Sequence, residues 1–165
     1  MRFVLPISKD LKQSKHEVGA SFCRSIVGFQ SLVKEIRPGV PLEAPAVKAF
    51  LDGWGAVNAD RAAMEEVLDA AEAELDDFLA GMEAKDSYDK LVKLIRRKWM
   101  AAIDGAREKI QTCLDAWADH VDKLGRKPVV GERWLEKALD TSIDVTLFMG
   151  CLPDEITIKK GELFG

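Results

Sequence analysis

The sequence predicts an all-α fold: an antiparallel four-helix bundle with a long, partly projecting, coiled-coil-like central hairpin. Three observations predict this class. Apolar residues recur at spacings of three and four over most of the chain, as they do on the buried face of a helix. Proline and glycine gather at a few points that divide the chain into helical segments. The two middle segments carry charges of opposite sign. We treat residues 1–165 as a single domain.

The first helix is expected over about residues 11–37 and the second over about 45–83. The first ends before Pro38, because a residue that precedes proline is pushed out of the α region. Pro45 suits the first position of the second helix. The second helix carries a heptad seam that is interrupted by one charged residue, Arg61. Its apolar members are Val47, Phe50, Trp54, Val57, Met64, Leu68, Ala71, Leu75, Phe78 and Met82.

The third helix is expected over about residues 87–124 and the fourth over about 131–149. Gly125 and Pro128 mark the end of the third helix. The tail EITIKKGELFG alternates apolar and polar residues in the manner of a strand. A short β pairing of this tail with Phe3–Leu5 is one expectation, although an isolated pair of this length is only marginally stable.

The second and third helices should form an antiparallel hairpin that turns near residues 85–86. Trp54 then faces Trp117, and the other connections bring Phe29 and Trp134 to the same end of the bundle. Two glycines flank Trp54 within DGWGAVNAD. They allow either a break in the helix or room for neighbouring rings, and the continuous seam favours room.

Charge supports the same pairing of helices. Residues 60–83 contain nine acids and one base, whereas residues 85–98 contain six bases and two acids. In an antiparallel hairpin these two runs face each other, with Glu72 to Asp76 opposite Ile95 to Trp99. Exposed ion pairs contribute less than about 1 kcal/mol each, so we expect this pattern to define the register more than the stability.

The hairpin tip is the predicted docking surface. The third helix should be roughly 58 Å long, compared with roughly 40 Å for the first and 28 Å for the fourth. The tip therefore outruns its neighbours, yet it is rich in apolar side chains, which need a cover. That cover is the two tails, a protein partner or a second copy of the chain. The residues predicted to bind a partner are Leu79, Met82, Leu91, Leu94, Trp99 and Met100.

The residues that usually carry chemistry are sparse. The chain has two histidines, neither in an ExxH or HExxH pattern, and three widely spaced cysteines. Carboxylates at i,i+3 spacing, such as Glu66 with Asp69, are the kind that hold Mg²⁺ in all-α pyrophosphohydrolases. With 28 acids in the chain, however, such pairs arise by chance. We expect no catalytic residue, no cofactor and no metal, and retain a magnesium-dependent pyrophosphohydrolase as a minor alternative.

The run KLIRRKW offers a second alternative, a small helical subunit of a nucleoprotein complex. Trp99 could stack on a base there. The facing acids and the net charge of −4 weigh against it. The candidate nucleic-acid residues are Lys90, Lys93, Arg96, Arg97 and Lys98.

The function predicted from the sequence is a non-enzymatic protein-binding module, an accessory, adaptor or inhibitor subunit that docks on a larger partner through the hairpin tip. No apolar run approaches the ~18 residues that cross a bilayer, so no membrane role is expected. The odd number of cysteines argues against a disulfide framework. The expected location is the reducing cytoplasm.

Overall fold

The computed structural model describes residues 1–83, 89–141, 152 and 154–164. It is mostly helical (79%), which confirms the predicted class, and the described residues form five helices and one small antiparallel sheet. In chain order the elements are β1 (Arg2–Val4), α1 (Lys9–Lys34), α2 (Ala44–Glu83), α3 (Asp89–Arg126), α4 (Glu132–Asp140), β2 (Glu155–Thr157) and α6 (Lys160–Phe164).

Local chemistry explains where the first helix begins and ends. The Ser8 hydroxyl caps α1 by accepting a hydrogen bond from the Leu11 amide, at 3.2 Å, so the helix begins two residues before the predicted start. It ends at Lys34, three residues before the predicted end. The predicted bounds of the second and third helices agree with α2 and α3 to within two residues.

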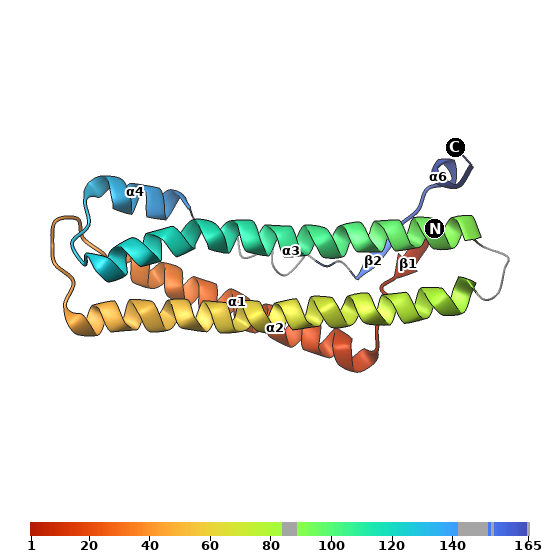
Figure 1. Cartoon of the computed structure of the whole chain (residues 1–165), viewed down its shortest axis with the longest axis horizontal. Helices are drawn as coiled ribbons and strands as arrows, with labels where there is room; N and C mark the ends of the chain where they lie inside the picture. Colours follow the sequence, from red (N-terminus) through yellow and green to blue (C-terminus); the bar gives the residue numbers. More distant parts are fainter. Residues whose placement is uncertain (84–88, 142–151, 153, 165) are drawn as a thin grey trace.

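The fourth helix is described over only part of its predicted range. The helix α4 runs from Glu132 to Asp140 with Thr141 as its C-cap, and residues 142–149 lie outside the described part of the chain. A bundle of four comparable helices therefore stays a prediction. The described core consists of three long antiparallel helices with α4 beside one end (Figure 1).

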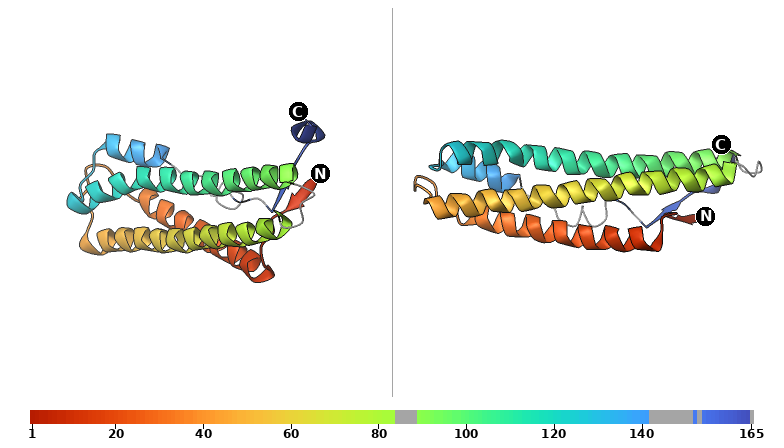
Figure 2. Two further views of the ribbon diagram at one scale, coloured as in Figure 1. Left: turned by 45° about the vertical axis from the view of Figure 1, so that its right-hand side comes forward. Right: turned by 60° about the horizontal axis from the view of Figure 1, so that its bottom comes forward.

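The α2–α3 hairpin projects beyond α1, as the helix lengths predicted (Figures 1 and 2). The connection between α1 and α2 lies at one end of the molecule, which we call the loop end. The C-terminal end of α2 and the N-terminal end of α3 lie at the other end of the molecule, which we call the hairpin tip. Both ends of the chain lie near the tip.

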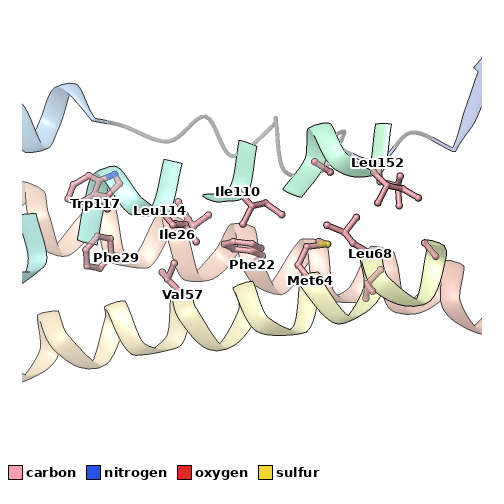
Figure 3. Packing of buried hydrophobic residues seen from close by; sticks show 14 of the residues in the cluster. Phe22, Ile26, Phe29, Val57, Met64, Leu68, Ile110, Leu114, Trp117 and Leu152 are labelled. Atoms are coloured by element: carbon pink, nitrogen blue, oxygen red, sulfur yellow. The ribbon is translucent and has the colours of Figure 1, made fainter. Parts of the chain in front are cut away.

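Ion pairs bridge α2 and α3, and the one nearest the tip agrees with the predicted hairpin register. Asp76 pairs with Arg96, close to the predicted alignment. Farther from the tip, the Arg107 guanidinium lies 2.7 Å from a carboxylate oxygen of Asp69 and 3.0 Å from one of Glu72. These contacts hold the pKa of Arg107 above its usual range, through the hydrogen bond to Asp69 first and that to Glu72 next. In the space between the three long helices, their apolar side chains point toward one another (Figure 3).

The predicted aromatic cluster forms at the loop end. The Phe29 ring lies 5.3 Å from the Trp54 ring and 5.2 Å from the Trp117 ring, between centroids. His120 extends the cluster, since its ring lies 5.6 Å from Trp117 and 6.0 Å from Trp134. Edge and tilted contacts at these distances are the favourable arrangements for aromatic rings.

The glycines beside Trp54 do not both serve as clearance. The helix α2 continues through them, so the alternative of a break is wrong. A Cβ on Gly53 would lie 3.1 Å from Cδ1 of Leu32 and 3.7 Å from Cδ2 of Phe29, whereas a Cβ on Gly55 would meet nothing within 4 Å. The clearance interpretation therefore holds for Gly53, where the room is for α1 side chains, and is wrong for Gly55.

The tails pair as the sequence suggested. In the antiparallel sheet Phe3 lies opposite Ile156, with Arg2 opposite Thr157 and Val4 opposite Glu155. The last part of the tail differs from the expected strand, because Lys160–Phe164 is a short helix. Its Glu162 carboxylate lies 2.8 Å from the Lys98 ammonium, which ties the tail to α3.

A buried lysine ties the tail to α1. The Lys15 side chain is only 7% exposed, and its Nζ lies 2.7 Å from a carboxylate oxygen of Asp154, just before β2. The hydrogen bond from Lys15 holds the pKa of Asp154 below its ordinary value. Tertiary contacts of this kind explain why a sheet too short to be stable alone persists in the folded chain.

Candidate functional site

A groove lies at the hairpin tip, between the N-terminal segment and the two long helices. Its volume is about 280 Å³. The N-terminal segment supplies one wall, and α2 and α3 supply the other wall and the floor. The lining residues are Arg2, Phe3, Val4, Pro6, Phe78, Met82, Ile95 and Trp99. Seven of these eight residues are apolar, so the groove fits an apolar side chain.

The rim of the groove exposes large apolar side chains. Val4 is 59% exposed and Phe78 is 48% exposed, while Met82 is partly buried. Trp99 lies at the floor and is fully buried. Its indole nitrogen has no hydrogen-bond partner among the described residues. This rim is the apolar surface that the tip presents outward.

The six residues predicted to bind a partner divide into two groups. Leu79, Leu94 and Trp99 are buried inside the fold. Met82, Leu91 and Met100 are partly buried and lie against the core. The tails thus cover part of the hairpin surface, one of the three coverings that the sequence left open, and only part of the predicted surface faces outward.

Phe78 is the rim residue that the sequence placed wrongly. The heptad seam assigns Phe78 to the core and Leu79 to the flank, but Leu79 is fully buried and Phe78 is half exposed. The buried face of α2 passes from Leu75 to Leu79, a spacing of four where the seam predicted three. A straight helix drifts relative to a strict seven-residue repeat, and this drift accounts for the change near the tip.

The basic residues of α3 are already engaged in part. Arg96 pairs with Asp76, and Lys98 pairs with Glu162 and donates to the Thr157 carbonyl oxygen at 3.1 Å. Lys90, Lys93 and Arg97 are exposed. The face that would bind a phosphate backbone is therefore smaller than the sequence suggests.

At least one carboxylate of each described i,i+3 pair takes part in a contact within the protein. Asp69 pairs with Arg107, Asp119 with Lys123 and Asp122 with Arg126. Glu74 accepts a hydrogen bond from the Ser8 amide at 2.6 Å. Among residues 1–83, 89–141, 152 and 154–164, no group of three or more potential ligands is placed to hold a metal ion.

His120 belongs to the aromatic cluster rather than to the groove. Its Nε2 lies 3.1 Å from the Thr141 hydroxyl oxygen, and its ring contacts two tryptophans. Burial is the main reason that the pKa of His120 lies below its ordinary value; nearby Lys123 and Lys137 lower it further, and Asp119 opposes them.

Comparisons with protein-family models, curated proteins and solved structures return no match to this chain. None of the described helices combines the length and the apolar character that crossing a membrane requires.

Proposed function

We propose that this protein is a non-enzymatic protein-binding module, an accessory, adaptor or inhibitor subunit that docks on a larger partner through the groove at its hairpin tip. The observation that carries the proposal is the exposed apolar rim of Val4 and Phe78 around that groove. Phenylalanine and methionine are enriched in the cores of protein–protein interfaces, and Phe78 and Met82 both line this groove.

The docking surface differs from the one that the sequence predicted. Val4 and Phe78 replace the buried Leu79, Leu94 and Trp99 as the outward-facing residues. Met82 remains in the surface, because it lines the groove beside Phe78. Rigid neighbours support these side chains, since α2 and α3 are held together here by the Asp76–Arg96 pair.

The other two candidate functions have less support. Nucleic-acid binding requires several free cations on one face, and the ion pairs of Arg96 and Lys98 reduce that set. A magnesium-dependent hydrolase requires converging carboxylates, and the described carboxylates of Asp69, Asp119 and Asp122 form ion pairs with bases instead.

The proposal is tested by photo-cross-linking from the groove rim. A photoreactive phenylalanine analogue replaces Phe78 in the full chain, which is expressed and irradiated in its native cells. The matched control carries the analogue at Val27, which is 50% exposed on α1 and lies away from the groove. We expect discrete adducts with another protein from position 78 and none of the same mass from position 27. Absence of adducts from position 78, or the same adducts from both positions, would contradict the proposal.

A second copy of the chain is the alternative partner. Size-exclusion chromatography with light scattering, at micromolar concentration, distinguishes a second copy from a different partner protein. The proposed module is a monomer on its own. A dimer that dissociates when Phe78 is replaced by Ser would show that the groove binds a second copy instead.

A further inference from the structure

The open edge of β1 runs beside the groove. In an antiparallel pair, residues directly opposite each other alternate between exchanging both backbone hydrogen bonds and exchanging none. Met1 and Ile158 exchange both, at 2.9 and 2.8 Å. The alternation makes Phe3 with Ile156 the next bonded pair. The backbone N–H and C=O groups of Arg2 and Val4 therefore point away from β2.

The two edges of this small sheet are not equivalent. On the outer edge of β2, the Thr157 carbonyl oxygen accepts a hydrogen bond from the Lys98 ammonium, so α3 covers that edge. On the outer edge of β1, no hydrogen bond to Arg2 or Val4 backbone groups is formed by the described part of the chain. In Figure 1, β1 lies on the side of β2 nearer the hairpin tip. Unpaired strand edges readily accept a further strand.

We infer that the occupant of the groove is an extended peptide segment of a partner protein, which adds as a third strand to the outer edge of β1 and inserts an apolar side chain into the groove. This inference rests on the proposed function and specifies the kind of partner. The backbone of the added segment forms hydrogen bonds with the outward-pointing N–H and C=O groups of Arg2 and Val4. Because side chains alternate along a strand, every second residue of the segment faces the groove.

Charge and size select this occupant. Among the described residues that line the groove, Arg2 is the charged one, and its side chain is 77% exposed on the outer face of β1, 3.9 Å from a carboxylate oxygen of Glu155. An acidic residue on the outer face of the added strand would share this exposed guanidinium with Glu155. A strand of three residues spans only about 10 Å. Stable dimers bury about 800 Å² on each partner, which an edge of this length does not supply, so a short segment fits better than a second folded copy.

The test selects ligands without assuming a partner. A phage-displayed library of random twelve-residue peptides is selected on the full chain, and the most enriched peptide is synthesised as the probe. We expect apolar residues at alternate positions and an acidic residue among the intervening ones. Binding should slow amide exchange at Arg2 and Val4 and leave Phe3, which is already paired with β2, unchanged.

Two substitutions of Val4 separate backbone pairing from side-chain contact. Val4→Pro removes the outward N–H without removing a bond to β2, and Val4→Thr keeps both the N–H and a β-branched side chain. We expect Val4→Pro to weaken the probe at least tenfold and Val4→Thr less than threefold. If Val4→Pro unfolds the tail, amide exchange in the unchanged chain still decides the outcome.

Some results would overturn strand addition. Enriched peptides with apolar residues at helical spacings, or binding that leaves the Val4 amide unprotected, would contradict the inference while leaving the protein-binding role standing. A library without any enrichment would also contradict it. The cross-linking from position 78 tests the proposed function separately, so the two failures are distinguishable.

Discussion

At the scale of single residues, the two glycines beside Trp54 show that identical residues in one helix can lie in different surroundings. Leu32 and Phe29 of α1 crowd the position of a Cβ on Gly53, while Gly55 faces open space. Glycine in a helix interior costs up to about 1 kcal/mol relative to alanine. At Gly53 this cost allows close packing with α1. At Gly55 no contact in the structure offsets it.

The glycine pair gives a matched prediction. Gly55→Ala should raise the free energy of unfolding by about 0.5–1 kcal/mol, because it restricts the unfolded chain and meets no neighbour. Gly53→Ala should gain less, because the new methyl group must displace the end of the Leu32 side chain. Urea denaturation of the two variants measures the difference. Equal gains would show that Leu32 moves aside without cost.

His120 gives a pH-dependent prediction. Its pKa is lowered in the folded protein, mainly by burial, so the unfolded chain takes up a proton more readily. Stability should therefore fall as the pH decreases through the ordinary histidine pKa, about 6.5. His120→Gln keeps a polar group near Thr141 and should remove this part of the pH dependence. We expect unfolding curves of the two proteins between pH 8 and pH 5 to diverge on the acid side; parallel curves would contradict the assignment.

At the scale of elements, the Lys15–Asp154 pair attaches the tail to α1. The ammonium is buried, whereas the Asp154 side chain is 56% exposed. Removal of Asp154 and removal of Lys15 therefore have different consequences for stability. A buried ammonium left alone loses its compensating charge, while a half-exposed carboxylate left alone is solvated by water.

This asymmetry predicts the order of two variants. Asp154→Ala should destabilise the protein by about 1–2 kcal/mol, because it leaves the Lys15 charge buried without its partner. Lys15→Met should destabilise it less, because it fills the same space without a charge. Thermal unfolding gives the order, and amide exchange at Leu5 and Ile158 reports whether the tail loosens. A larger loss from Lys15→Met would contradict the account.

Local sequence predicts the helices and their pairing better than it predicts their coverings. The seam and the opposite charges place Trp54 and Trp117 at one end of the bundle, where both contact Phe29, and Asp76 near Arg96. These positions follow from short connections and a regular period. The burial of Trp99 depends in part on the N-terminal segment, which lines the same groove. Such a distant pairing carries little local signal, so Trp99 resembled surplus apolar surface.

The groove lies at the end of the hairpin where the sequence predicted a docking surface, but most of its lining residues differ from the predicted ones. The length of α2 and α3 indicates the hairpin tip, and the groove lies there. Phe78 was assigned to the core because the seam was extended at constant phase. A spacing of four after Leu75 places Leu79 in the core and Phe78 on the exposed flank. Because both residues are apolar, the sequence is compatible with either spacing.

At the scale of the whole molecule, the two ends have different characters. The loop end contains the aromatic cluster, and it also exposes apolar side chains, namely Val40 (55%), Leu51 (42%) and Val129 (38%). The hairpin tip combines exposed apolar side chains with an open strand edge. The combination of exposed apolar side chains with unpaired backbone groups of β1 is why we propose partner binding at the tip.

The most direct test of this assignment is the affinity of the protein captured through position 78 for two variants of the full chain, measured by calorimetry. Phe78→Ser alters the tip, and Leu51→Ser alters an equally apolar position at the loop end. We predict that Phe78→Ser weakens binding at least tenfold and that Leu51→Ser leaves it unchanged. Loss of affinity with Leu51→Ser and none with Phe78→Ser would contradict the assignment of the hairpin tip as the binding site.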